Sequence, residues 1–124
     1  MGHIARQGND SPLHVKSRDF AIAIVEMVKQ NNDWRVNSLF QQILRSATSV
    51  HANVRESEYA QSLPDFIAKL TISLKEANET KGWLEILYGA DCIDESIFNP
   101  LYNNCKELIA ILVASIKTAK NNNQ

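Results

Sequence analysis

Apolar residues recur every three or four positions along most of the chain, which is the spacing of one face of an α-helix. No stretch alternates apolar and polar residues as a half-buried strand does, and no hairpin dipeptide such as Asn-Gly occurs. Proline, glycine and runs of asparagine fall mostly between these patterns, where helices end. Such a chain can build a core only by packing helix against helix.

Four helices are expected, with short connections between them. The expected ranges are 13–31 (with a start as late as 17), 35–62, 64–89, and a fourth helix that ends near residue 120. Pro100 leaves two choices for the fourth helix: a turn and then a helix capped by Asn99, or one kinked helix capped by Asp94. Amphipathic helices joined by short loops predict an all-α, antiparallel, up-down four-helix bundle.

The length of 124 residues suits a single domain with a sizeable core. We expect a flexible N-terminal segment at 1–12, the bundle domain at 13–120 and a frayed tail at 121–124. No apolar run is long enough for a membrane helix, and the first residues lack the apolar core of a signal peptide. We therefore expect no membrane partner and a cytoplasmic location.

The residues that usually carry chemistry are sparse. Cys92 and Cys105 show no C-x-x-C spacing, and Cys105 lies on an apolar stripe, so we expect it to be a small buried side chain. The three histidines show no metal-ligand spacing. Glu76 and Glu79 form a carboxylate pair, but no His or Asp accompanies them at ligand spacing. We expect no catalytic residues, no metal, no cofactor and no enzymatic activity.

The second expected helix has an outer face of unusual composition. Arg45, Ser49, Ala52 and Glu56 point away from its apolar stripe, and Asn53 borders that stripe. A solvated face more often carries Lys and Glu, which favour helix, whereas small side chains let another helix approach closely. Two interpretations stay open: a solvated polar surface, or a contact with another helix or subunit.

The third expected helix carries a second apolar band besides its core stripe. The band consists of Ile72, Glu76, Glu79, Trp83 and Ile86. Its two carboxylates need partners if they are buried, and Arg45, Arg55 or the Asn53 amide could supply one. A polar network is therefore the favoured interpretation. Apolar surface beyond the needs of one core also argues for a homo-oligomer.

Charge is unevenly distributed although the formal net charge is only −1. The segment from Arg35 to Arg55 contains three arginines, one histidine and no acid. The candidate contacts to nucleic-acid phosphates are Arg35, His51, Arg55, Lys117 and Lys120. The arginines do not form one stripe on a straight helix, so a continuous basic surface would require assembly, which repeats them on each subunit.

Three stretches resemble a known family. They are KSRDFAIAIVEMVK, LRSATSVHANVRESEYAQSLPDFIAKLTISLKEANETKGWLEIL and LYNNCKELIAILVASIKTAK, which together span most of residues 16–120. The motif is Arg45, Ser49, Asn53 and Glu56, followed by Lys75, Glu76 and Glu79. These stretches resemble the bacterial four-helix bundle proteins, also called the 23S rRNA intervening-sequence protein family.

The resemblance implies a small bundle that assembles as a homopentameric ring and has no enzymatic activity. Some family members are encoded in sequences inserted in ribosomal RNA genes. The family is also similar to the accessory protein of diversity-generating retroelements, a pentamer that works beside a reverse transcriptase and RNA. The mildly negative net charge of this chain departs from the basic surface expected of such a protein.

Two hypotheses follow for the function. The first is a non-enzymatic homo-oligomer that binds nucleic acid, with structured RNA or a nucleic-acid-processing protein as its partner. The second is a protein-interaction module with no nucleic-acid role, whose ring presents a groove to a protein partner. Because phosphate contacts depend on positive charge, only the first predicts a steep loss of binding as salt rises.

Overall fold

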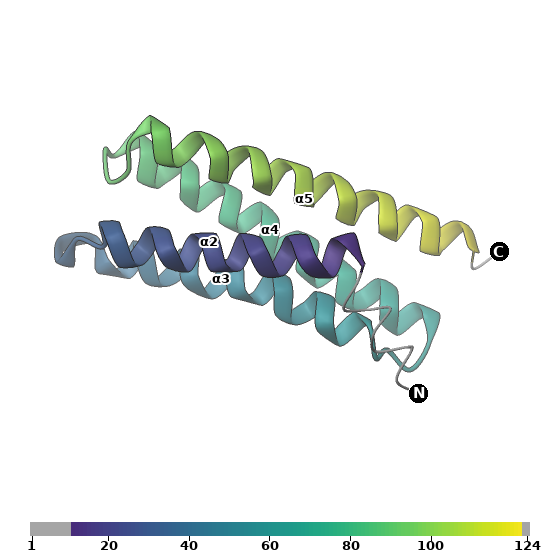
Figure 1. The fold of residues 1–124 in the computed structure, drawn as a ribbon. Helices are drawn as coiled ribbons and strands as arrows, with labels where there is room; N and C mark the ends of the chain where they lie inside the picture. The colour runs from purple at the N-terminus through teal and green to yellow at the C-terminus, as the bar shows by residue number, and fades with distance from the viewer. Residues whose placement is uncertain (1–10, 123–124) are drawn as a thin grey trace.

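The computed structural model describes residues 11–122, which form four long helices packed side by side (Figure 1). The helices are α2 (Pro12–Asn31), α3 (Asn37–Ser57), α4 (Leu63–Gly89) and α5 (Glu95–Asn122), with a short 3₁₀ helix (Trp34–Val36) before α3. Within this range there are no strands. The predicted all-α bundle of four helices is confirmed.

Each helix runs antiparallel to its neighbours. α3 packs between α2 and α4, and α5 packs against α4 and more lightly against α2, so α2 and α4 occupy opposite corners (Figure 1). The register of α3 and α4 shows their direction, because Ser46 meets Thr80 whereas Val50 meets Ser73. One end of the bundle therefore carries the start of α2 and the last turns of α5.

The helix starts follow local capping chemistry. The Ser11 hydroxyl accepts a hydrogen bond from His14 N, and Pro12 occupies the first turn of α2, slightly before the predicted start. Asp94 Oδ1 accepts from Ile97 N at 3.1 Å, so α5 starts next to Asp94 and continues through Pro100. The alternative start at Asn99 is wrong, because Pro100 lies near the start of α5 and removes only one backbone donor.

The predicted range 35–62 for the second helix is too long at both ends. Arg35 lies in the 3₁₀ helix, where the Asp33 carboxylate accepts from its backbone N–H. α3 ends at Ser57, and the chain turns before Ser62 caps α4. Residues 1–10 and 123–124 of the predicted terminal segments lie outside the described range, while Asn121 and Asn122 belong to α5.

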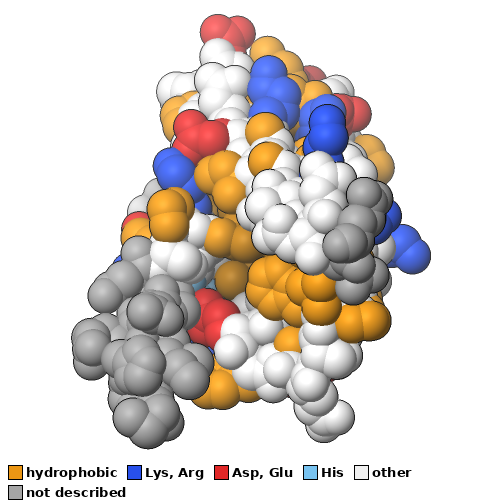
Figure 2. All heavy atoms as spheres, turned by 90° about the vertical axis from the view of Figure 1, so that its right-hand side faces the viewer, with side chains coloured by type: hydrophobic (Ala, Val, Ile, Leu, Met, Phe, Trp, Pro, Cys, Tyr) orange, Lys and Arg blue, Asp and Glu red, His pale blue; other side chains and the backbone are white. Residues whose placement is uncertain are grey.

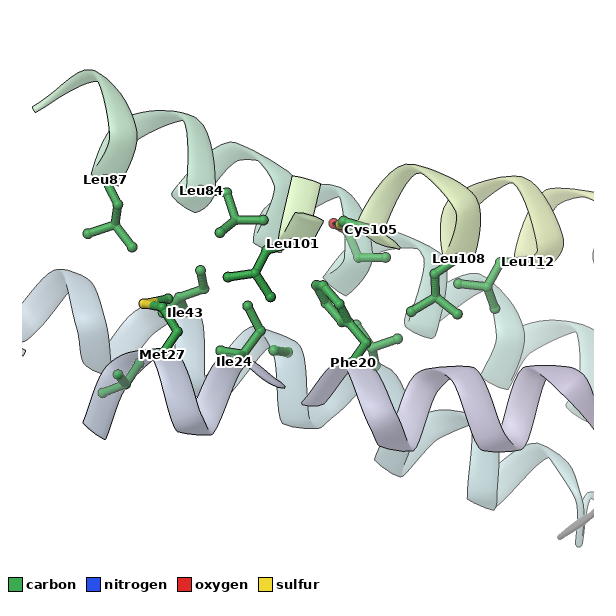
Figure 3. Close-up of a cluster of buried hydrophobic side chains, with 14 of the residues drawn as sticks. Phe20, Ile24, Met27, Ile43, Leu84, Leu87, Leu101, Cys105, Leu108 and Leu112 are labelled. Atoms are coloured by element: carbon green, nitrogen blue, oxygen red, sulfur yellow. Dashed lines mark hydrogen bonds between the residues drawn. The ribbon is translucent and has the colours of Figure 1, made fainter. Parts of the chain in front are cut away.

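The core fills the space between the four helices (Figure 3). The apolar stripe of α5 is buried along its length: Leu101, Cys105, Leu108, Leu112, Ile116 and Ala119. The apolar stripe of α2 is buried as well: Phe20, Ile24, Met27 and Val28. Cys105 is fully buried in the core, which confirms it as a small buried side chain, and this burial raises the pKa of its thiol to about 12.

The core face of α4 mixes apolar side chains with hydroxyls. Leu70, Ala77 and Leu84 are buried in the core, and Phe66, Ile67, Leu74 and Tyr88 are partly buried and pack against it. Ser73, Thr80 and Leu87 are buried as well. Ser73 Oγ donates to the Val50 carbonyl oxygen and Thr80 Oγ1 donates to Ser46 Oγ, both at 2.8 Å. Hydrogen-bonded hydroxyls thus replace apolar side chains where α3 and α4 meet.

No helix in the described range is long and apolar enough to cross a membrane.

Candidate functional site

An ion-pair network joins the outer faces of α3 and α4. The Arg45 guanidinium contacts Glu76 at 3.2 Å and also pairs with Glu79. Trp83 Nε1 donates to Glu79 Oε2 at 3.2 Å. The hydrogen bond that Arg45 donates to Glu79, more than any other contact, raises the pKa of Arg45. The sequence left Arg45, Arg55 and the Asn53 amide as possible partners for these carboxylates, and in the structure the partner is Arg45.

Apolar side chains lie at both ends of this network. Ile72 is 42% exposed and Ile86 is 48% exposed, which is high for isoleucine. The band from Ile72 through Glu76, Glu79 and Trp83 to Ile86 advances by four and three residues alternately. This spacing is the one by which two helices pack along a seam. The outer surface of α4 thus has the geometry of a second packing face.

The neighbouring surface of α3 is made of small side chains. Ser49 is partly buried and Ala52 is exposed beside the α4 band. We call this surface the α3–α4 face: Arg45, Ser49 and Ala52 of α3, with Ile72, Glu76, Glu79, Trp83 and Ile86 of α4. Two predicted network members do not join it, because Asn53 donates to the Ser49 carbonyl oxygen and Glu56 is exposed without an ion pair in the described range.

A buried polar cluster that the sequence did not predict connects α2 with the end of α3. His14 Nδ1 donates to Glu58 Oε2 at 2.6 Å, and Ser17 Oγ lies 2.9 Å from His51 Nδ1. The two imidazoles meet edge to face, with ring centroids 5.1 Å apart. His14 is 3% exposed and Ser17 is fully buried. The burial of His14 and Ser17 could have been predicted from their spacing, because they precede Phe20 at intervals of three residues and so continue the buried face of α2.

The Ser17–His51 pair does not have the geometry of a nucleophile and its base. Ser17 Oγ donates its single hydrogen to the His14 carbonyl oxygen at 3.1 Å, so its lone pairs face His51. The hydroxyl is also closed to solvent, whereas a nucleophile must reach its substrate. The cluster instead fixes the position of the His51 ring.

Positive charge gathers around His51. Burial, and then the nearby His14, Arg55 and Arg18, lower the pKa of His51. Arg18 contacts Asp19 at 3.2 Å, and the exposed Arg55 has no ion pair in the described range. The structure therefore brings together two of the predicted phosphate contacts, His51 and Arg55, and adds Arg18, which the sequence did not single out.

The other predicted phosphate contacts lie elsewhere. Arg35 is bound to Asp33 at 2.7 Å, at the opposite end of α3 from Arg55, and this contact lowers the pKa of Asp33 to about 2. Lys117 and Lys120 line a shallow hollow on the α4–α5 side of the bundle, away from the α2–α3 side that carries His51. A single subunit thus has no continuous basic surface from these five residues.

An apolar groove opens where α2 begins and α5 ends, and Figure 2 looks onto this end. Two adjoining hollows of about 520 Å³ each share Phe66 of α4 with Ile111 and Ser115 of α5. The second hollow reaches Val54 of α3 and Glu58, which follows the last residue of that helix. The groove therefore adjoins the buried polar cluster.

The fold agrees with what comparison to other proteins shows. The family model of the 23S rRNA-intervening sequence protein matches residues 10–114. The chain belongs to this family. A crystal structure of a protein of unknown function from the S23 ribosomal protein family of Bacteroides thetaiotaomicron is similar, with 43% identity and a TM-score of 0.80. The similarity covers 85% of this chain and 98% of that one. No curated protein matches.

Membership of the 23S rRNA-intervening sequence protein family confirms the resemblance seen in the sequence. It does not assign a ligand, since the similar crystal structure is itself of a protein of unknown function. The pentameric state that the resemblance implies stays a prediction.

The lowered pKa of His51 predicts how stability of this family member depends on pH. Folding keeps His51 neutral, so its contribution to stability is complete above the unfolded pKa of 6.5 and is lost as pH falls toward the folded pKa. Urea unfolding of the protein and of His51→Gln at pH 7.5 and 5.5 measures this contribution. We expect the stability of the two proteins to converge at the lower pH. A gap that widens at pH 5.5 would contradict the assignment.

Proposed function

We propose that this chain is a non-enzymatic four-helix bundle that assembles with copies of itself through the α3–α4 face and binds structured RNA in the cytoplasm. The observation that carries the assembly is the exposed apolar band of α4, in which both carboxylates already have a cation. Buried carboxylates without a partner oppose association, whereas Arg45 offsets part of that cost for Glu76 and Glu79.

The composition of the α3–α4 face supports a helix-on-helix contact between subunits. Trp83 is a large, partly buried side chain within the band, and tryptophan is enriched where interfaces gain most of their energy. Ser49 and Ala52 leave room for a neighbouring helix beside it. The resemblance to the family makes five the proposed number of copies, arranged as a closed ring.

The cluster of Arg18, His51 and Arg55 supports RNA as the ligand. Of these, Arg55 has no ion pair in the described range, so its charge remains available to a phosphate. In a ring each subunit repeats the cluster, and several weak phosphate contacts add to one strong interaction. Local positive charge therefore supports binding although the chain as a whole carries −1.

Binding of a labelled RNA hairpin at about 50 mM and about 200 mM salt tests the RNA function. Neutralising several phosphates releases their counterions, so we expect affinity to fall by at least about tenfold between the two concentrations. Arg55→Gln should bind more weakly and lose less affinity with added salt. Absence of binding at both salt concentrations would contradict the RNA function.

A protein partner is the second candidate function, and the apolar groove at the end of the bundle favours it. The groove is lined by Phe66, Ile111 and neighbouring small side chains, which suits an amphipathic segment better than a phosphate. If RNA binding fails, capture of a protein partner is compared between the unmodified protein and Phe66→Asp. A partner that the unmodified protein retains and the variant loses would support this function.

A further inference from the structure

We propose that His51, with Arg18 and Arg55 nearby, binds a phosphodiester of the RNA ligand and gains a proton as it does so. The inference rests on the proposed RNA function and assigns to it a site and a pH dependence. It begins from a cluster that the packing of the bundle does not require: three basic side chains from two helices on one side of the molecule.

The hydrogen bonds around His51 fix which nitrogen faces outward. Ser17 gives its hydrogen to the His14 carbonyl oxygen, so Nδ1 of His51 must donate to Ser17 Oγ. In the neutral ring Nε2 then carries the lone pair, and it has no hydrogen-bond partner among residues 11–122. A protonated Nε2 is a donor free to bond a phosphate oxygen.

The groups that face His51 are mainly cationic or neutral. From α2 they are His14 and Arg18, and from its own helix Arg55. Glu58 is engaged by His14, and Asp19 by Arg18, so neither carboxylate contacts His51 itself. This field disfavours the imidazolium in the free protein. An anion bound at His51 reverses the balance, because it attracts the added proton as well as the nearby guanidinium groups.

Proton uptake follows from this reversal. A phosphodiester keeps its charge between pH 5 and 8, so any change of affinity in this window comes from the protein. Binding raises the pKa of His51, and affinity therefore rises as pH falls through the pKa of the complex. The rise levels off below the pKa of the free protein. For each site that takes up one proton, the affinity for RNA rises by at most tenfold per unit fall in pH.

The buried pair next to His51 acts as its support. His14 is held by Glu58 at 2.6 Å and meets the His51 ring at an interplanar angle of 80°. Together with Ser17, this pair fixes the His51 ring so that the site exists before the ligand arrives. Preorganisation of this kind lowers the entropy lost on binding.

Affinity for an RNA hairpin at pH 6.0, 7.0 and 8.0 and constant ionic strength tests the inference. The proteins compared are the full chain, His51→Gln, Arg55→Gln and, as a matched control on the α4–α5 side, Lys117→Gln. We expect affinity of the unmodified protein to rise at least about threefold from pH 8.0 to 6.0. His51→Gln should lose this rise, Arg55→Gln should bind more weakly at every pH, and Lys117→Gln should keep the rise.

Failure of this inference is distinguishable from failure of the RNA function. RNA binding whose pH dependence survives in His51→Gln would overturn the inference alone. If the unmodified protein binds no RNA, sulfate becomes the deciding probe, because it does not titrate in this range. A His51 pKa, followed by proton NMR of its ring, that rises with added sulfate would support an anion site here, and an unchanged pKa would overturn it.

Discussion

Replacing Ile72 and Ile86 together by aspartate should convert the assembled protein into folded monomers of 14.0 kDa. Each new carboxylate would enter an apolar seam where Arg45 already serves two acids, Glu76 and Glu79. An unpaired buried charge costs about 3 kcal/mol or more, and about 6 kcal/mol in total would weaken association by roughly four orders of magnitude. Sedimentation velocity measures the particle mass.

The monomer should stay folded, because both isoleucines are 42–48% exposed within a single subunit and contribute little to its core. Circular dichroism should therefore show unchanged helix content. The matched control is the pair Ile22→Asp and Val113→Asp on α2 and α5, which are 52% and 48% exposed outside the α3–α4 face. That control should keep the mass of the unmodified protein. Loss of assembly in the control, but not in the Ile72 and Ile86 variant, would place the contact on another face.

Phe40→Ala should destabilise the bundle by about 3–5 kcal/mol. Phe40 is fully buried on α3, the helix that packs between α2 and α4, so the lost ring leaves a cavity that two interfaces share. For a domain of this size we expect the melting temperature to fall by roughly 10–25 °C. Urea unfolding gives the free energy, and thermal circular dichroism gives the melting temperature.

Phe98→Ala is the matched control for Phe40→Ala, since the same atoms are removed. Phe98 is only partly buried and stacks between Tyr88 and Tyr102, with centroid distances of 4.3 and 4.7 Å. Its loss costs those ring contacts but leaves the core filled, so we expect less than half the effect. Equal destabilisation by the two variants would contradict the assignment of Phe40 to the shared core.

Apolar spacing predicted the core faces of α2 and α5 because apolar side chains fill them, as Ile24 and Leu108 illustrate. The same rule predicts only part of the buried face of α4. There Ser73 and Thr80 take the buried positions, and their hydroxyls find acceptors on α3. A rule that counts only apolar residues reads such positions as surface, although a hydrogen-bonded hydroxyl is inexpensive to bury.

The candidate site was predictable only up to the register between helices. Helical periodicity placed Arg45 on an outer face and Glu76 and Glu79 in a second band, but it could not choose between Arg45 and Arg55 as their partner. That choice depends on how far α4 slides along α3. The contact between His14 and Glu58 joins residues 44 positions apart and depends on register in the same way.

The basic residues show the same limit on a larger scale. Arg35 and Arg55 belong to the same segment of the sequence without acidic residues. The 20 positions of helix between them nevertheless place them about 30 Å apart. The sequence did not predict Arg18 as a phosphate contact, because it lies on a different helix from His51. Only the packing of α2 on α3 brings the two residues near each other.

The mass of the unmodified protein in solution is the first test of assembly through the α3–α4 face. Sedimentation equilibrium over a range of concentrations gives this mass without assuming a shape. Assembly predicts a mass that is a multiple of 14.0 kDa, with five copies as the expected number. A mass of 14.0 kDa at every concentration would contradict it, and the band from Ile72 to Ile86 would then be solvent-exposed surface.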